Sequence, residues 1–392
     1  MAQDNRCVIG LDLGDAWSVY SVLDPEGAEV DAGRVRTNRE AFRKHFGGIP
    51  AAKVVMEAGS HSPWASRVIG GCGHAVVVAN ARALALIYGS THKSARLDAQ
   101  RLAELGRLSS RILSPVEHRS EEQQADLEVV RARALLVEQR TALVNHVRGA
   151  VKSFGERLPA CSTGSFVKRV AESIPEALRP ALEPHLRILE HLNQEIAAYD
   201  RQVERLGSTK YPETERLRQV KGVGGLTALC YLLTLSNAGR FRRSRNVGAY
   251  VGLAPRKDAS GESDPQRGIT KAGNGPLRVL LMQCAHYILG PFGPDTDLRR
   301  KGQESMARGG KSAKKRRPIA SFWPKNCAGV VPGQPVARRR SRSGDATPMR
   351  DNNRRRTSPV SSMIGRRTLS SVADAKTAGP WFRCAASSSM RP

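Results

Sequence analysis

The sequence predicts an α/β domain at the N-terminus, followed by long helices and a small, mainly helical domain. Between residues 7 and 108, short apolar segments alternate with helical patterns, whereas residues 126–206 show helical periodicity alone. A glycine-rich turn then starts a new pattern near Leu217. Because near-continuous apolar strands separated by helices form sheets that are covered on both faces, the first segment indicates an α/β layer.

The N-terminal segment begins with a predicted meander of three strands. These are Val8–Leu13, Val19–Leu23 and, after the turn Pro25-Glu26-Gly27, Ala28–Val30. Helices and strands then alternate: a helix over Asn38–Phe46, a strand over Lys53–Glu57, a helix over Trp64–Ile69, a strand over His74–Ala79 and a helix over Ala95–Leu108. A meander that leads into alternating units is the order of a ribonuclease-H-like domain, for which about a hundred residues suffice.

Two long helices are predicted in the middle of the chain. The first, over residues 126–154, has apolar residues at spacings of four and three. The second, from Leu182 to Leu206, repeats apolar residues almost as heptads, with Glu, Arg and Gln around the rest of the helix. The pattern fits two helices that contact only each other, and it fits a dimerisation seam equally well.

The charge of the chain indicates a nucleic-acid partner. Lys and Arg number 63 against 36 Asp and Glu, and residues 301–392 alone hold 21 basic and four acidic residues. Such an excess favours neutralisation of phosphates. A membrane is the weaker alternative, because no apolar run reaches the roughly 18 residues needed to span a bilayer. Seven cysteines without CxxC spacing, and an N-terminus without an apolar signal segment, predict a cytoplasmic protein with reduced thiols.

Three carboxylates lie at the ends of predicted elements. Asp12 ends the first strand, Glu57 ends the strand Lys53–Glu57, and Asp98 opens the helix Ala95–Leu108. A carboxylate at the end of a buried strand is unfavourable unless it is paired or binds a cation. Singly, each fits a helix cap or a solvated turn residue. Together they suit Mg²⁺ (or Mn²⁺), which binds carboxylates and phosphate and stabilises attack on a phosphodiester.

A phosphate-binding turn is predicted at Val220–Ala228, which has the pattern of a helix-hairpin-helix. Gly222 and Gly224 let backbone N–H groups approach a phosphate, and Lys221 adds positive charge; an ordinary loop is the alternative. Four arginines follow closely and are predicted to contact a nucleic-acid backbone rather than only form a solvated face. They are Arg240, Arg242, Arg243 and Arg245.

Two sets of motifs resemble the IS-one-ten insertion-sequence transposases, a family of bridge-RNA-guided recombinases. The C-terminal set consists of Gly252-Leu253-Ala254-Pro255, Ser260-Gly261, Gly268-Ile269-Thr270-Lys271, Gly273-Asn274 and Leu277-Arg278. The N-terminal set, which is similar to the family's RuvC-like DEDD domain, consists of Val8–Asp12, Met56-Glu57-Ala58-Gly59, His92-Lys93-Ser94 and Leu97-Asp98-Ala99. The resemblance spans residues 7–317.

This resemblance implies a DNA transposase and recombinase with a composite site. The carboxylates would hold Mg²⁺ near the scissile phosphate, and Ser260 would be a nucleophile that links covalently to DNA. Lys271 and Arg278 would offset phosphate charge. Without the resemblance, Ser260 is interpreted as a turn residue. The implied partners are DNA, a structured guide RNA and further copies of the chain (a dimer or tetramer through the helical linker), in the bacterial cytosol and associated with the nucleoid.

The chain departs from the family pattern at two places. The family pattern Lys-Ser/Thr-Asp-x-x-Asp-Ala has two aspartates one helical turn apart, but Ala95 occupies the first position here, and a methyl group cannot ligate Mg²⁺. After Lys311–Arg316 the family continues into an amphipathic helix, whereas this chain continues without periodicity. Our hypothesis is a frameshift, with an added RNA-binding tail as the alternative; a helix-coding continuation in another reading frame would support the frameshift.

We therefore predict four regions: a RuvC-like catalytic domain (1–110), a helical coiled-coil linker (111–215), a C-terminal transposase domain (216–317) and a basic disordered or frameshifted tail (318–392). Two alternative functions are a structure-specific nuclease or resolvase without a covalent serine step, and a catalytically impaired nucleic-acid-binding remnant. A sugar-kinase or actin-like phosphotransferase would share the run Gly10–Gly14, but the chain lacks a second copy of that core.

Overall fold

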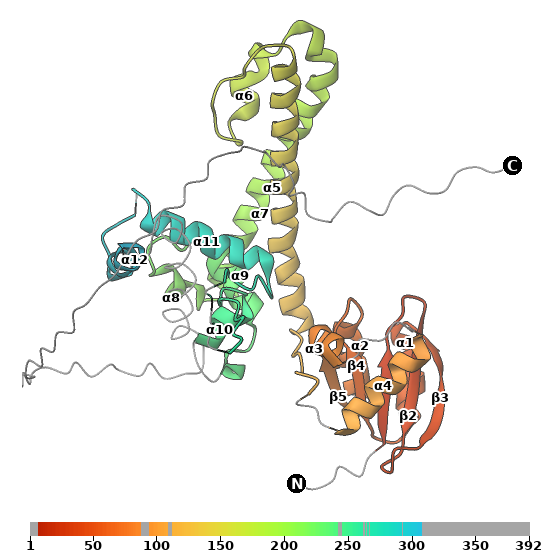
Figure 1. The fold of residues 1–392 in the computed structure, drawn as a ribbon. Coiled ribbons are helices and arrows are strands. Elements are labelled where there is room, and N and C mark those ends of the chain that lie inside the picture. Colours follow the sequence, from red (N-terminus) through yellow and green to blue (C-terminus); the bar gives the residue numbers. More distant parts are fainter. Residues whose placement is uncertain are drawn as a thin grey trace, which may run out of the picture. The chain divides into compact units, whose positions relative to one another are not determined.

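The computed structural model describes residues 7–87, 94–108, 112–241, 245–261, 263, 265, 267–291 and 293–307 (Figure 1). The predicted tail, residues 318–392, lies outside these ranges. Two of the predicted nucleic-acid contacts, Arg242 and Arg243, also lie outside them, as does the side chain of Arg245.

Five strands form one mixed sheet in the order β3-β2-β1-β4-β5. The strands are β1 (Val8–Asp12), β2 (Trp17–Leu23), β3 (Glu29–Arg36), β4 (Lys53–Glu57) and β5 (Ala75–Ala79). The first three pair antiparallel as a meander, whereas β4 pairs parallel with both β1 and β5. The predicted meander and alternating units are confirmed, and the sheet is consistent with a ribonuclease-H-like domain.

The third strand is longer than the sequence predicted. The apolar pattern ended it at Val30, but β3 continues to Arg36 at the edge of the sheet. An edge strand pairs on one side only, and most side chains of β3 are exposed. Its polar residues therefore carry little of the alternation by which strands are recognised, and they protect the edge from pairing with other chains.

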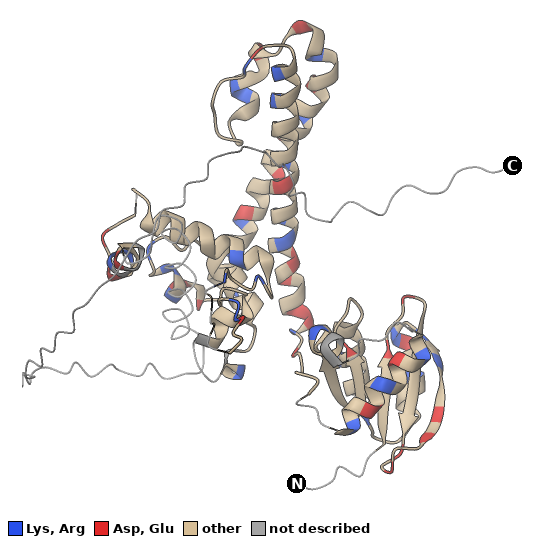
Figure 2. Ribbon diagram, in the orientation of Figure 1, with Lys and Arg blue, Asp and Glu red and all other residues tan. Residues whose placement is uncertain are grey.

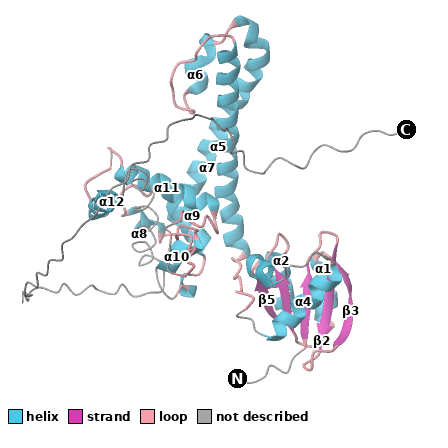
Figure 3. Cartoon of the chain, viewed as in Figure 1, coloured by secondary structure: helices cyan, strands magenta, loops and turns pink. Residues whose placement is uncertain are grey.

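Helices cover both faces of this sheet (Figure 3). They are α1 (Arg39–Gly47), α2 (Ser62–Gly71), α3 (Ala81–Ile87), which the sequence did not predict, and α4 (Ala95–Leu108). Phe42, Phe46 and Ile69 of α1 and α2 pack with Ile9 and Leu11. On the other face, Leu102, Ala103 and Leu105 of α4 pack with Val8 and Val55. The two apolar clusters hold the sheet between helical layers.

The two predicted long helices, α5 (Glu121–Ser153) and α7 (Arg179–Thr209), pack side by side (Figure 1). Short elements join them: α6 (Phe166–Val170), η1 (Ala171–Ser173) and η2 (Glu176–Leu178). The apolar seam of α7 is buried, namely Leu182, Leu186, Leu189, Leu192, Ile196 and Val203. Arg133 Nε lies 2.6 Å from Asp200 Oδ1, and Arg140 Nη1 donates to Asn193 Oδ1 over 2.9 Å, so polar contacts also cross the pair.

The remaining described elements are α8 (Thr214–Arg218), α9 (Gly225–Leu235), η3 (Ala238–Arg240), α10 (Arg245–Tyr250), α11 (Gly275–Leu289) and α12 (Asp297–Ala307). Leu229, Leu233, Leu253, Leu277 and Leu281 are central to their core. That core also contains Leu127 and Val130 of α5 and Val203 of α7, so packing continues across the predicted boundary at residue 216. No described helix is both long and apolar enough to traverse a bilayer.

Candidate functional site

The predicted metal ligands come from three elements of the N-terminal domain. Asp12 is the last residue of β1 and Glu57 the last residue of β4. Because β1 and β4 are parallel neighbours, both carboxylates lie at the same end of the sheet, where these two strands finish. Asp98 lies in the first turn of α4, which packs on β1. Asp12 and Asp98 are partly exposed and Glu57 is exposed, so the group is accessible from solvent.

A close approach between helix and strand determines where Asp98 lies. A Cβ atom added at Gly10 would overlap the carbonyl oxygen of Ala99 and the backbone nitrogen of Ala103. Only a glycine in β1 therefore allows α4 to lie this near the strand. Lys53 Nζ, on β4, donates to Gly106 O over 2.5 Å and fixes the other end of α4. The sequence showed Gly10 and Ala99 inside motifs, but not that they touch.

The three carboxylates interact electrostatically. Burial raises the pKa of Asp12, and the negative charges of Asp98 and Glu57 raise this pKa further. Arg101 Nη1 lies 3.9 Å from Asp98 Oδ1 and offsets part of this charge. Within the residues that the structure describes, no three His, Cys, Asp or Glu side chains converge into a preformed metal cluster. The repulsion nevertheless suits a divalent cation, and carboxylate oxygens are the ligands that Mg²⁺ prefers.

A histidine that the sequence analysis did not single out lies in the loop after Glu57. His61 Nδ1 accepts a hydrogen bond from Trp64 Nε1 over 3.1 Å. Since Nδ1 is an acceptor, the neutral ring carries its proton on Nε2, which lies 3.3 Å from Asp15 Oδ1. Asp15 follows β1 by three residues, so this pair links the loops after β1 and β4. No spacing in the sequence indicates it.

The same loop is held by a buried serine. Ser62 Oγ accepts from Gly59 N over 3.0 Å and donates to Gly59 O over 2.8 Å, and it lies 2.9 Å from His118 Nε2. Burial, followed by the charges of Arg67 and Arg119, lowers the pKa of His118 and keeps its imidazole neutral. An open pocket of about 480 Å³ lies nearby, lined by Thr37, Asn38, Arg39, His61, Trp64, Arg67, Glu121, Gln124, Ala125 and Glu128.

Ser260 lies on an exposed loop of the C-terminal domain. Its backbone pairs with that of Ser263 through two N–H···O bonds of 3.0 Å, and Gly261 between them has φ +56°. Near the base of the loop, Arg267 Nε donates to Asp258 Oδ2 over 3.0 Å. Ser260 is exposed, so its hydroxyl is open to a substrate.

Two glycines fix the segments that carry this loop. Gly252 has φ +73° and Gly273 has φ +75°. A Cβ at Gly252 would overlap the backbone of Ala272, and one at Gly273 would overlap the carbonyl oxygen of Tyr250. The two segments therefore cross in backbone contact, and Lys271 between them has φ +55°, which a non-glycine residue rarely adopts.

Arg278 is engaged inside this crossing. Its Nη1 donates to Val251 O over 3.0 Å and to Ala272 O over 3.1 Å. Asn274 Oδ1 caps α11 by accepting from Leu277 N over 2.8 Å. The family motif Gly273-Asn274…Leu277-Arg278 thus has structural roles, and of the two predicted charge-offsetting residues Lys271 is the one with an exposed side chain.

Comparison with known proteins places both halves of the chain in one family. A protein-family model described as "Transposase IS116/IS110/IS902 family" matches residues 214–296, and a DEDD transposase model of the IS110 type matches residues 9–155. The chain is 31% identical to the "Transposase for insertion sequence element IS1111A" of Coxiella burnetii, over 72% of this chain and 78% of that protein. The chain belongs to the IS110/IS116/IS902 transposase family.

Further relatives agree with this assignment. The transposase is 31% identical to a "Probable family 20 transposase" of Pseudomonas aeruginosa, over 77% of this chain and 90% of that protein. It is 29% identical to the "Transposase for insertion sequence element IS1328" of Yersinia enterocolitica, over 73% and 84% of the two chains. It is therefore an insertion-sequence transposase that acts on DNA, and DEDD domains of this kind generally depend on a divalent metal.

The predicted helix-hairpin-helix of the transposase forms a short helix, a turn and a second helix, α8 and α9. Gly222 has φ +96°, and a Cβ there would meet Ile288 and Tyr287 of α11. A Cβ at Gly225 would meet the Glu204 carboxylate, so that carboxylate lies beside the first turn of α9. Gly224 opens to free space, and Lys221 is exposed. The positive end of α9 thus has an internal anion beside it, to which Arg218 Nη1 donates over 3.0 Å.

Arg240 of the transposase packs against aromatic rings. Its Cζ lies 4.8 Å from the ring centroid of Phe241 and 4.5 Å from that of Tyr250. Its Nε and Nη2 are buried without a hydrogen-bond partner in the described part of the chain. The predicted phosphate contact thus points into an aromatic cluster, where cation–π attraction holds it.

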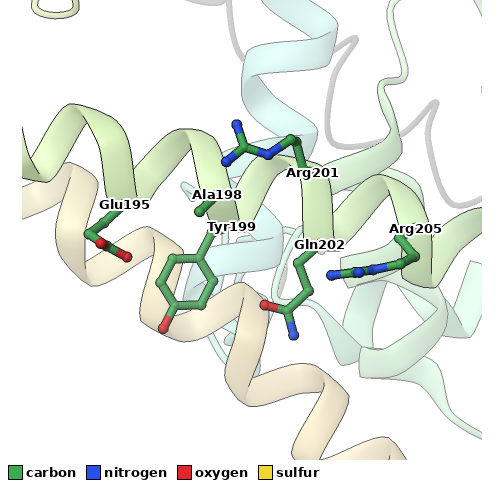
Figure 4. A pocket seen from close by; sticks show the side chains of 6 residues that line it. All are labelled: Glu195, Ala198, Tyr199, Arg201, Gln202 and Arg205. Atoms are coloured by element: carbon green, nitrogen blue, oxygen red, sulfur yellow. The ribbon is translucent and has the colours of Figure 1, made fainter.

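A second hollow, of about 640 Å³, lies along α7 (Figure 4). Its lining residues all come from that helix: Glu195, Ala198, Tyr199, Arg201, Gln202 and Arg205. Basic and acidic residues are mixed along α5 and α7 (Figure 2), and the charged residues of the lining are Glu195, Arg201 and Arg205.

Proposed function

We propose that this transposase cuts and rejoins DNA with two sets of side chains. Asp12, Glu57 and Asp98 would hold Mg²⁺ or Mn²⁺, and Ser260 would attack the phosphodiester. The observation that carries the metal assignment is that Asp12 and Glu57 end two adjacent parallel strands, with Asp98 in the first turn of the helix that packs on β1. Burial, followed by the charges of Asp98 and Glu57, raises the pKa of Asp12. A divalent cation relieves such repulsion, and when bound it stabilises charge that develops on the scissile phosphate.

In the proposed reaction, Ser260 Oγ forms a bond to phosphorus and gives up its proton, while the bond from phosphorus to one deoxyribose oxygen breaks. The departing strand takes a proton and leaves as a hydroxyl. The phosphoserine ester keeps the free energy of the broken linkage, so a second DNA hydroxyl can displace the serine without ATP. The exposure of Ser260 and its unhindered Gly261 neighbour support this role.

The proposal also covers the residues that contact nucleic acid, the guide and the association of copies of the chain. Lys221 and Lys271 are exposed cations suited to backbone phosphates. We propose a structured RNA as the guide and the α5–α7 pair as the surface that joins copies of the chain into a dimer or tetramer. The predicted division into domains at residues 110, 215 and 317 is proposed with it.

The decisive experiment follows covalent adducts in a cleavage reaction with DNA that carries the ends of the insertion sequence. Asp12→Asn and Glu57→Gln should abolish cleavage while DNA binding persists. Ser260→Ala should remove protein–DNA adducts seen on denaturing gels, whereas Ser263→Ala, in the same loop, should retain them. Cleavage without adducts in the unaltered chain would favour a nuclease without a serine step, and binding without cleavage would favour a catalytically impaired remnant.

A further inference from the structure

A tryptophan ring on the sheet contacts two guanidinium groups, and none of these three residues belongs to the candidate site described above. The Cζ atoms of Arg34 and Arg36 lie 4.7 Å and 4.5 Å from the ring centroid of Trp17. Trp17 begins β2, and in the β2–β3 register it lies opposite Arg36. Both arginines are exposed and Trp17 is 38% exposed. We call these three residues the Trp17 cluster.

The Trp17 cluster lies on the same face and at the same edge of the sheet as Asp12. Asp12 is opposite Val19 on β2, and Val19 is opposite Arg34 on β3. Directly paired residues point to the same face, so Asp12 and Arg34 belong to one row across three strands. With neighbouring strands about 4.8 Å apart, their Cα atoms are separated by roughly 10 Å. Trp17 and Arg36 pair with each other two residues from Val19 and Arg34, toward the end of the sheet at which Asp12 lies.

Charge is segregated along β3. The strand begins with the acidic residues Glu29 and Asp31 and ends with Arg34 and Arg36 (Figure 2). Glu29 is already paired, since Arg96 Nη2 lies 3.2 Å from its Oε2. Neither arginine of the cluster has a carboxylate partner in the part of the chain that the structure describes; the contacts of both are with the ring. The basic end of β3 therefore presents two exposed cations at the end of the sheet where Asp12 and Glu57 lie.

Two explanations compete for such a group. Charged residues on an edge strand prevent pairing with other chains, and this would explain arginines alone. It does not explain why both guanidinium groups lie on one tryptophan ring. Arginines held on an aromatic platform match the chemistry of a nucleic-acid strand, in which guanidinium groups contact phosphates and rings contact bases.

We propose that the Trp17 cluster binds a single DNA strand and directs it to the carboxylates. Trp17 orders the two guanidinium groups by cation–π contact, so that both contact phosphates next to the scissile one. The exposed part of the ring contacts a base of the same strand. The proposal rests on the function proposed for Asp12, because the position of that carboxylate identifies the bound strand as the one to be cut.

The test is photocross-linking of the full chain to a single-stranded DNA that contains iododeoxyuridine, without divalent cations. The expected result is a cross-linked peptide that contains Trp17. Arg34→Gln with Arg36→Gln should lower the yield of this peptide about tenfold, since it removes the two phosphate contacts. The matched control, Arg43→Gln with Lys44→Gln, removes the same charge from exposed positions on α1. It should leave the yield within about twofold, because charge removed elsewhere in the domain leaves these two phosphate contacts in place.

Three outcomes would overturn the proposal: no cross-link at Trp17 in the unaltered chain, an equal loss of yield in both double variants, or a marked preference for an RNA of the same sequence. Trp17→Phe keeps an aromatic platform and guards against misfolding; it should retain DNA affinity that Trp17→Ala loses. Cross-linking needs no cleavage, so a chain that cross-links at Trp17 but never cuts DNA would refute the proposed function and leave this binding site standing.

Discussion

Asp12 and Glu57 end regular strands, whereas Ser260 lies on a loop whose position depends on backbone contacts elsewhere in its domain. Parallel pairing of β1 and β4 brings the two carboxylates to one edge, and α4 adds Asp98 because Gly10 permits close contact. In the C-terminal domain, by contrast, Gly252 and Gly273 allow two segments to cross.

Folding therefore costs a different kind of free energy in each of the two regions. Burying Asp12 and placing it beside Asp98 and Glu57 costs electrostatic free energy, which appears as the raised pKa of Asp12. Ordering the serine loop costs conformational free energy, which appears as positive φ at three positions of the two crossing segments, Gly252, Lys271 and Gly273. A cation can relieve the first cost. The second is met by packing and by the hydrogen bonds of Arg278.

The largest effect is expected at the crossing. Gly252→Ala combines a positive φ with overlap onto Ala272, and should lower the free energy of unfolding of the C-terminal domain by about 3 kcal/mol or more. Urea denaturation followed by circular dichroism measures this. Gly268→Ala, where a Cβ meets open space, is the control and should change stability little. Equal effects of the two would show that the crossing does not constrain the fold.

A slightly smaller effect is expected in the N-terminal domain. Gly10→Ala should push α4 away from β1 and lower the free energy of unfolding by about 2 kcal/mol, within the usual range for overpacking. It should also abolish metal-dependent cleavage, because Asp98 moves with the helix. Gly71→Ala, at an open position of α2, serves as the control. Full cleavage by a folded Gly10→Ala chain would show that Asp98 takes no part in the reaction.

Arg278→Met should leave the carbonyls of Val251 and Ala272 without their charged donor. The expected loss is about 2 kcal/mol, as for hydrogen bonds to a charged group. Thermal unfolding is the measurement. Lys271→Met should have a smaller effect on stability and a larger effect on the salt dependence of DNA binding. The reverse ranking would make Arg278, and not Lys271, the phosphate contact.

The carboxylate group should make stability depend on pH without metal. The pKa of Asp12 is higher in the folded chain than in the unfolded one, so the folded state holds the proton more tightly. Below about pH 4 this electrostatic cost is lost, because Asp12 takes up its proton. As the pH rises through the raised pKa, the burial of the charge and its repulsion by Asp98 and Glu57 destabilise the folded chain. Asp12→Asn should stabilise the metal-free chain at pH 7 by less than about 1 kcal/mol, because solvent screens this partly exposed group. The gain should disappear at pH 3; a gain that persists there would assign it to another cause.

The smallest change in stability is expected at Ala95, the first residue of α4, which is exposed. Ala95→Asp favours the helix dipole by roughly 0.5 kcal/mol but adds charge near Asp98. It rebuilds the family's pair of aspartates, so cleavage should need less Mg²⁺ or Mn²⁺. Ala95→Asn is the uncharged control. Identical metal demand in all three chains would place residue 95 away from the metal.

Much of the α/β domain was predictable because its strands are buried and apolar. The strand Lys53–Glu57 and the helix Ala95–Leu108 were predicted with the bounds that β4 and α4 have. The exposed strand β3 was cut short, and α3 was not predicted at all. A local pattern reports burial, so it missed the exposed part of β3. The helix α3 contains the buried Leu84, but its seven residues are too few to show a helical period.

The residue types at the candidate site follow from the sequence by itself: carboxylates at strand ends, a serine beside glycine and an excess of cations. Which of them meet was decided by tertiary structure. Arg240 turned onto Phe241 and Tyr250, Arg278 onto two carbonyls, and Arg34 and Arg36 onto Trp17. An arginine reads the same in sequence whether it faces solvent, a ring or a carbonyl, because the folded backbone decides which of these lies beside its side chain.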